Sequence, residues 1–257
     1  MTGTVWRWVG LAVCLLLAAS RGTVAAGPRT FTVLGAADLA FAFKEIVPRF
    51  EQATGAEVTL VLGSSGNLAK QVASGMPADV FFSADQRFID DLIDAGHAIR
   101  ETRAVYAQGR IVLATAKAFG PKLTELRELA DPRVRRVAIA NPRHAPYGRA
   151  AEEALRAVGL WETLRPKLVY GENIRHTLQF LQTGAVDAGI VALSVADVPE
   201  VEWVLIDAAL HAPLDQAVAV LRRSRHPELA LEFIRFVNGP VGRPIMKRYG
   251  FRLPGEF

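Results

Sequence analysis

Four short segments rich in small residues could each bind a negatively charged group. The first turn of a helix has backbone N–H groups without helical partners and lies at the positive end of the helix dipole, so it binds anions. Each segment follows an apolar run and precedes a stretch with helical periodicity: Gly35-Ala36-Ala37-Asp38, Gly63-Ser64-Ser65-Gly66-Asn67, Pro146-Tyr147-Gly148 and Gly171-Glu172-Asn173. Together these segments predict a protein that captures a small oxyanion.

Signals for catalysis are weaker than this anion-binding signal. The pattern Gly63-x-Ser65-x-Asn67 lacks the last glycine of a nucleophile elbow. The five histidines form no metal-ligand spacing, and no glycine-rich nucleotide loop is present. We therefore predict a binding protein that is not an enzyme and has no cofactor. The alternative from another class is a hydrolase with Asp38 or Ser65 as its nucleophile.

The N-terminal segment has the pattern of a cleavable signal peptide spanning residues 1–26. Arg7 precedes an apolar run over residues 8–19, and Val24-Ala25-Ala26 offers small residues for cleavage. The apolar run is too short to span a bilayer. Cys14 lies within it, but Val13 is a poor fit for the residue before a lipid-modified cysteine. The segment therefore indicates secretion by cleavage, with a lipid anchor as the weaker alternative.

Cleavage after residue 26 would leave a chain without cysteine. Cys14 is the single cysteine, so disulfides and thiolate metal sites are not expected. The remaining 231 residues would carry 28 basic and 26 acidic side chains, a formal balance of +2. No basic stripe interleaved with aromatic residues indicates nucleic-acid binding.

The elements that position the four segments alternate between strands and helices, which predicts an α/β protein. The helical stripes end at glycines, among them Gly55, Gly96, Gly159 and Gly184. The predicted strands are apolar on both faces, as in parallel strands covered on both sides. They span residues 31–34, 58–62, 80–82, 111–115, 137–140, 188–191, 203–206 and 217–221.

The anion-binding segments fall into two pairs, one before residue 100 and one after residue 140. This division predicts two lobes, the first built from residues 27–107 and 216–257 and the second from residues 108–215. The chain would cross between them near residues 106–109 and 213–216. A ligand would bind in the cleft between the lobes, at the carboxyl ends of the strands.

Several longer segments carry a family resemblance. They are Gly63–Gln71, Pro77–Asp85, Asn141–Gly148 and Lys247–Phe251. In their order and spacing the chain resembles the periplasmic molybdate-binding proteins of ABC transporters, which have the two-lobed type II solute-binding protein fold. The resemblance implies a monomeric periplasmic protein that captures molybdate, and tungstate as well, and delivers it to an inner-membrane permease.

The resemblance also implies which residues hold the anion. In that family a tetrahedral dianion is bound by serine hydroxyls, backbone N–H groups and a tyrosine hydroxyl, without counter-charges. These positions correspond to Ser65 with its neighbour Ser64, and to the backbone N–H groups of Tyr147 and Ile174. Two positions depart from the family pattern. Asp38 stands in place of a serine (or Ala37 does, if the register shifts by one), and Ala192 stands in place of the tyrosine.

Asp38 leaves two interpretations open. It can be an N-cap, accepting N–H groups of the helix that follows. If its carboxylate instead faced a dianion, each unit-charge pair at 4 Å would cost roughly 4 kcal/mol at an effective dielectric constant near 20. The cleft would tolerate this group if it were protonated, or if the cargo were a different oxyanion, a metal ion or a metal complex. The ring of Tyr147 could replace the missing phenol or merely cover the cleft.

Overall fold

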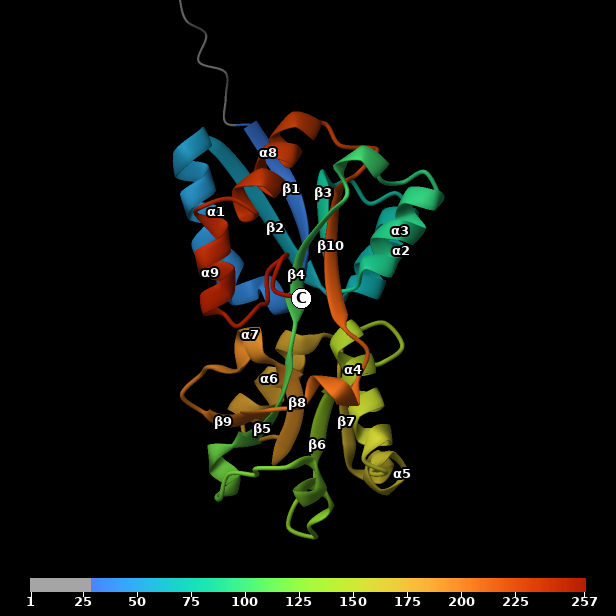
Figure 1. Ribbon diagram of the computed structural model, residues 1–257, viewed down its shortest axis with the longest axis vertical. Coiled ribbons are helices and arrows are strands. Elements are labelled where there is room, and N and C mark those ends of the chain that lie inside the picture. The colour runs from blue at the N-terminus through green and yellow to red at the C-terminus, as the bar shows by residue number, and fades with distance from the viewer. Residues whose placement is uncertain (1–28) are drawn as a thin grey trace, which may run out of the picture.

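The computed structural model describes residues 29–257, which form two α/β lobes stacked along the long axis (Figure 1). The predicted signal peptide, residues 1–26, lies outside the described residues. Each lobe contains one five-stranded sheet with helices on both faces. The predicted fold class, α/β with two lobes, is therefore confirmed.

The first lobe contains the sheet β2-β1-β3-β10-β4. Helices α1, α8 and α9 pack on one face, and α2 and α3 pack on the other (Figure 1). On the first face, Phe233 makes edge-to-face contacts with four other phenylalanines at 5.0–5.7 Å between ring centroids. The elements are β1 (Arg29–Ala36), α1 (Ala40–Thr54), β2 (Ala56–Gly63), α2 (Ser65–Ala73), β3 (Val80–Ser83), α3 (Gln86–Asp94), β4 (Ala104–Gly109), β10 (Leu214–Val220), α8 (Pro227–Val237) and α9 (Gly242–Arg248).

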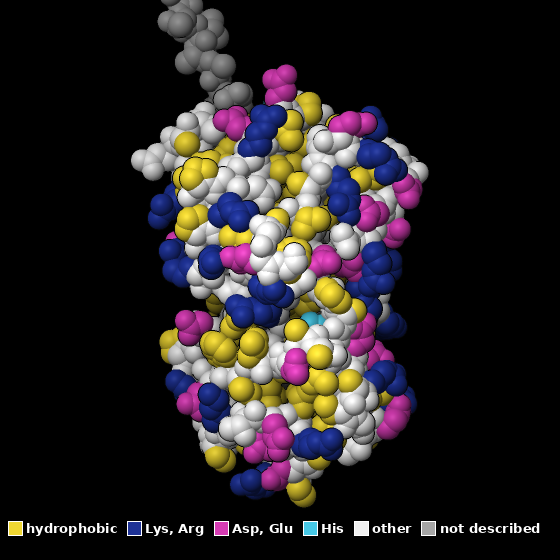
Figure 2. Space-filling model, viewed as in Figure 1, with side chains coloured by type: hydrophobic (Ala, Val, Ile, Leu, Met, Phe, Trp, Pro, Cys, Tyr) yellow, Lys and Arg dark blue, Asp and Glu magenta, His cyan; other side chains and the backbone are white. Residues whose placement is uncertain are grey.

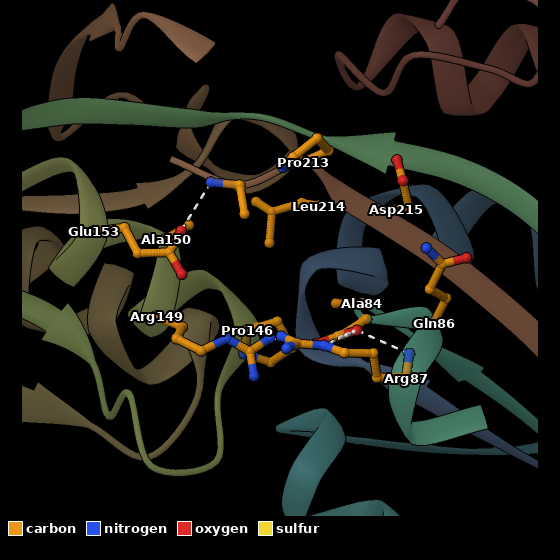
Figure 3. A pocket seen from close by; sticks show the side chains of 12 residues that line it. Ala84, Gln86, Arg87, Pro146, Arg149, Ala150, Glu153, Pro213, Leu214 and Asp215 are labelled. Atoms are coloured by element: carbon orange, nitrogen blue, oxygen red, sulfur yellow. Dashed lines mark hydrogen bonds and ion pairs between the residues drawn. The ribbon is translucent and has the colours of Figure 1, made fainter. Parts of the chain in front are cut away.

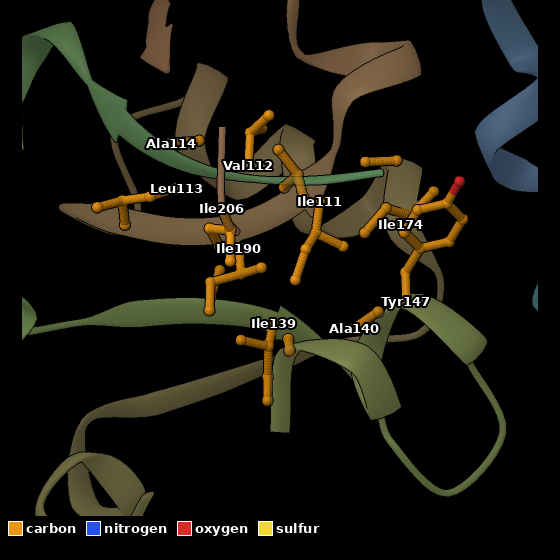
Figure 4. Close-up of a cluster of buried hydrophobic side chains, with 14 of the residues drawn as sticks. Ile111, Val112, Leu113, Ala114, Ile139, Ala140, Tyr147, Ile174, Ile190 and Ile206 are labelled. Carbon is orange, nitrogen blue, oxygen red and sulfur yellow. The ribbon is translucent and has the colours of Figure 1, made fainter. Parts of the chain in front are cut away.

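The second lobe contains the sheet β7-β6-β8-β5-β9. Its core is aliphatic, and Ile111, Ile139, Ile190 and Ile206 are part of the buried cluster drawn in Figure 4. The elements are β5 (Ile111–Ala116), β6 (Val137–Ala140), α4 (Pro146–Ala157), α5 (Trp161–Leu164), β7 (Leu168–Gly171), α6 (Ile174–Gln182), β8 (Ala188–Ala192), α7 (Leu193–Ala196) and β9 (Val201–Leu205).

The chain passes between the lobes twice. It leaves the first lobe from β4, which ends at Gly109, directly into β5, and it returns from β9 to β10, which begins at Leu214 (Figure 1). Short stretches of chain therefore join the two sheets, and the lobes can change their relative orientation there.

The eight predicted strands are all present, but the prediction of parallel strands is wrong in part. Strand β10 runs antiparallel to β3 and β4, and β5 runs antiparallel to β8 and β9. Both are central strands buried on two faces, so their apolar pattern is the same as that of parallel strands. Strands β4 and β7 were not predicted, because β4 contains Gln108 and Gly109 and the edge strand β7 is partly exposed and ends in Tyr170-Gly171.

The helix ends agree with the glycine signals. Gly55 caps α1 in the left-handed conformation, with φ of 67°, and Gly159 follows α4 with φ of 73°. None of the helices within residues 29–257 combines the length and the apolar character needed to cross a membrane. On the face visible in Figure 2, basic and acidic side chains are interspersed over both lobes, and the outline narrows between them.

Candidate functional site

Three of the four anion-binding segments, and Ile174 directly after the fourth, meet at one small cavity between the lobes. In the first lobe, Ala36 at the end of β1 lies opposite Gly63 at the end of β2. In the second lobe, Ala140 lies opposite Gly171 in the same way. Each pair of parallel strands thus brings two helix starts to the edge of the sheet that faces the other lobe. The cavity encloses about 10 Å³, and its lining residues are Ala36, Ala37, Asp38, Gly63, Ser64, Ser65, Ala84, Ala145, Pro146, Tyr147 and Ile174.

Ser65 offers a hydroxyl donor to this cavity. The side chain is fully buried, and its Oγ accepts a hydrogen bond from the N–H of Ala84 at 2.9 Å. The hydroxyl hydrogen of Ser65 is therefore free to be donated elsewhere. Ser64 is also at the cavity, but its Oγ lies 2.9 Å from Nδ1 of His144 in the second lobe. The backbone N–H of Gly66 donates to the carbonyl oxygen of the same histidine.

Two backbone N–H groups of the second lobe lie at the cavity in first helical turns. Ile174 is the first residue of α6, and the capping side chain of Asn173 accepts from the next two N–H groups instead, those of Arg175 and His176. Tyr147 is the second residue of α4, whose N-cap residue makes no side-chain capping bond. Neither N–H group has an acceptor within its own helix, so both can bind a ligand.

Asp38 is not an N-cap, and that interpretation was wrong. Neither the 3₁₀ turn that contains Asp38 nor the following helix α1 has a side-chain capping bond. The fully buried carboxylate lies at the lobe interface, where its Oδ2 accepts from the Tyr147 hydroxyl at 2.9 Å and from Nε2 of Gln216 at 2.8 Å. Within residues 29–257, its Oδ1 has no hydrogen-bond partner.

The electrostatics of this site follow from burial. Desolvation raises the pKa of Asp38 from 3.8 to about 6, against the effect of the hydrogen bonds from Gln216 and Tyr147. Desolvation and the nearby carboxylate together raise the pKa of Tyr147 well above its ordinary value, so the phenol stays neutral and donates. The phenol contacts Asp38 rather than merely covering the cleft.

Gln216 is a site residue that the sequence did not reveal. It lies fully buried in β10, and its Nε2 is 3.0 Å from the Tyr147 hydroxyl as well as bonded to Asp38. Its Oε1 has no partner among the residues that the structure describes. The one available signal was a polar side chain inside the apolar run of Leu214–Val220.

Ala192 does not line the cavity. It is buried at the end of β8, opposite Ile111. Two residues further on, the hydroxyl of Ser194 donates to the backbone oxygen of Asp38 at 2.9 Å. Five of the six predicted site residues therefore surround one cavity, and Ala192 is the exception.

A second, larger pocket opens beside this cavity, also between the lobes (Figure 3). It encloses about 260 Å³ and shares Ala84 and Pro146 with the first cavity. Arg149 from α4 forms an ion pair with Asp85, the N-cap of α3, across the lobe interface. Burial would raise the pKa of Asp85, but hydrogen bonds from Arg87 and Arg149 hold it below its usual value. This ion pair joins the two lobes.

The chain is similar to known molybdate-binding proteins over most of its length. Bacterial extracellular solute-binding proteins, as a family, match residues 31–252. The molybdate-binding protein ModA of Rhodobacter capsulatus is 32% identical over 210 residues, which are 81% of this chain and 82% of that protein. ModA of Escherichia coli is 31% identical over 258 residues, or 96% of this chain and 98% of that protein.

A solved structure gives the same result. The periplasmic molybdate-binding protein of Azotobacter vinelandii superposes with a TM-score of 0.81 at 29% identity, covering 87% of this chain and 99% of that chain. The resemblance seen in the sequence is thereby confirmed. The chain belongs to the family of bacterial extracellular solute-binding proteins.

Proposed function

We propose that this protein is the periplasmic receptor of an ABC transporter, which captures molybdate between its lobes and delivers it to an inner-membrane permease. The observation that carries the proposal is the convergence of three donors on one buried cavity. These are the Ser65 hydroxyl and the N–H groups of Tyr147 and Ile174. Relatives that bind molybdate, by their names, support the same cargo.

Capture requires the lobes to move. The cavity of about 10 Å³ has room for about one water molecule, so a tetrahedral oxyanion enters only when the lobes separate. Closure then replaces the water around the anion with fixed N–H and O–H donors, and no covalent bond is made or broken. We also propose that tungstate is accepted, since it offers the same four acceptor oxygens, and that residues 1–26 direct secretion.

Isothermal titration calorimetry with a panel of oxyanions tests this function. Molybdate and tungstate should each give saturable binding with one site per chain. Sulfate and phosphate serve as competing anions of similar shape. Absence of molybdate binding, together with saturable binding of a different solute, would reject the proposed cargo.

Replacing Ser65→Ala should weaken molybdate binding by more than about tenfold, because a hydrogen bond to a charged group contributes about 1.5–3 kcal/mol. Calorimetry measures the affinity. Ser74→Ala is the matched control, since Ser74 is exposed at the other end of α2. Equal affinity in the two variants would remove Ser65 from the site.

A further inference from the structure

We infer that the closed site holds one proton together with the anion, between Oδ1 of Asp38 and the nearest oxygen of the bound oxyanion. The inference rests on the proposed function and adds to it that the cargo is taken up as an anion plus a proton. Molybdate capture would then be linked to pH through a single carboxyl group at the lobe interface.

The hydrogen bonding around Asp38 motivates this inference. Its Oδ2 already accepts from Tyr147 and Gln216, whereas its Oδ1 is buried and has no hydrogen-bond partner in the described part of the chain. All four oxygens of molybdate are acceptors too. Because Asp38 lines the cavity, a bound oxyanion places one of its oxygens near Oδ1 of Asp38, and two negatively charged acceptors repel each other. A proton between these two oxygens replaces the repulsion with a hydrogen bond.

Within residues 29–257, no ion pair compensates the charge of Asp38. The side chains near its carboxylate are the hydroxyls of Tyr106 on β4 and Tyr147 on α4 and the amide of Gln216 on β10. The backbone N–H groups of Asp38 and Leu39 also lower its pKa, whereas the Ser194 hydroxyl donates to the backbone oxygen of Asp38. Burial raises the pKa of both tyrosines well above the ordinary value, so their hydroxyls are neutral.

The arginines near the lobe interface form no ion pair with Asp38 in the described part of the chain, although Nη1 of Arg175 is buried there without a hydrogen-bond partner. On α6 the guanidinium of Arg175 lies 4.6 Å from the centre of the Phe41 ring, and on α4 Arg149 pairs with Asp85. Among residues 29–257 no ion pair includes Asp38. A proton on Asp38 would neutralise this carboxylate beside a dianion without the movement of a charged side chain.

The direction of the pH effect follows. Burial, opposed by the hydrogen bonds from Gln216 and Tyr147, raises the pKa of Asp38 to about 6, and a neighbouring dianion would raise it further. Above pH 6 the free protein has lost this proton and the complex retains it, so binding takes up a proton. The affinity for molybdate then falls by up to about tenfold for each pH unit above this value.

The test is calorimetry of the protein with molybdate in buffers of different ionisation enthalpy, such as PIPES and Tris, from pH 5.5 to 8.5. We expect uptake of nearly one proton per anion at pH 7.5 and clearly less at pH 5.5. Asp38→Asn should abolish the uptake and make the affinity independent of pH. Asp215→Asn is the matched control, because Asp215 lies next to Gln216 but outside the small cavity, and it should keep the uptake.

A second variant separates proton binding from a structural role. Tyr147→Phe removes one donor to Oδ2, so the free carboxyl should bind its proton more tightly. On the acidic side, proton uptake falls to half at the pKa of Asp38 in the free protein. This pH should therefore rise above about 6 in the variant. Wild-type protein that binds molybdate without proton uptake, and with an affinity independent of pH, would overturn the inference and leave the proposed function intact. Absence of molybdate binding at every pH would overturn both.

Discussion

Asp38 shows how a single residue can oppose the stability of the fold. Its carboxyl has a pKa of about 6 in the folded protein and 3.8 as its ordinary value, so the folded state binds the proton more tightly. The stabilising contribution of the protonated carboxyl is complete below about pH 4 and is lost as the pH rises through 6. The free energy of unfolding is therefore about 3 kcal/mol higher below pH 4 than at a pH well above 6, as far as this carboxyl group determines it.

Asp38→Asn should therefore raise the melting temperature at pH 8 and change it much less at pH 4, where the wild-type carboxyl is already neutral. Differential scanning calorimetry at the two pH values measures this. Asp79 provides the contrast, because both of its buried oxygens accept hydrogen bonds, among them those from Thr32 and Ser224. Asp79→Asn should lower the melting temperature at pH 8. Equal behaviour of the two variants would contradict the assignment of Asp38 as a destabilising carboxylate.

The sequence predicted much of the site at this scale, and its failures have a physical cause. Ser65, Tyr147 and Ile174 were placed together correctly because each begins a helix after a strand. The orientation of Asp38 was undecided because a cap and a cleft residue share the same local sequence. Its partners, Tyr147 and Gln216, are 109 and 178 residues away along the chain, so local sequence could not distinguish the alternatives.

Among the helices and strands, two glycines allow close backbone contacts: Gly66 allows a contact between the lobes, and Gly148 allows one within the second lobe. A Cβ atom on Gly66 would lie 2.7 Å from the carbonyl oxygen of His144, which belongs to the other lobe. A Cβ atom on Gly148 would lie 2.1 Å from the carbonyl oxygen of Ala140, within the same lobe. The first contact exists only when the lobes are closed, whereas the second is part of the packing of α4 on β6.

Gly66→Ala should weaken molybdate binding by about tenfold or more without lowering the melting temperature, because separation of the lobes relieves the clash and depopulates the closed state. Gly148→Ala should lower the free energy of unfolding by about 1–3 kcal/mol through overpacking. Calorimetric titration and thermal melts of both variants check the pair. A loss of stability in Gly66→Ala would mean that this contact belongs to the fold rather than to closure.

Helix ends were more predictable than strand directions. Gly55 and Gly159 mark their helix ends by a conformation that other residues rarely adopt. Strand direction has no such local marker. The reversed strands β5 and β10 each follow directly after the chain has passed from one lobe to the other, so their direction depends on the path of the whole chain.

At the scale of the whole molecule, side chains bridge the lobes around the cavity. Arg149 pairs with Asp85, and Arg175 lies over the ring of Phe41. The guanidinium of Arg149 is about one third exposed, which limits its contribution to roughly 1 kcal/mol. Such contacts adjust the balance between open and closed states rather than the stability of either lobe.

Arg149→Ala should weaken molybdate binding by about fivefold, the factor that corresponds to 1 kcal/mol. Small-angle X-ray scattering should show a larger radius of gyration for this variant without molybdate, and a return to the compact form when the anion saturates it. Arg156→Ala is the control, because Arg156 also lies on α4 but pairs with Glu152 inside the second lobe. Identical scattering of all three proteins would argue against a role for Arg149 in closure.

The start of β1 has a practical consequence. Arg29 lies at the end of the first lobe that is remote from the cavity, and the second lobe contains neither the beginning nor the end of the described chain (Figure 1). A receptor immobilised on a sensor surface through a tag before Arg29 would thus keep its second lobe free to swing. A fluorescent dye on that lobe and a quencher on the sensor surface would report each binding event as a change in fluorescence intensity.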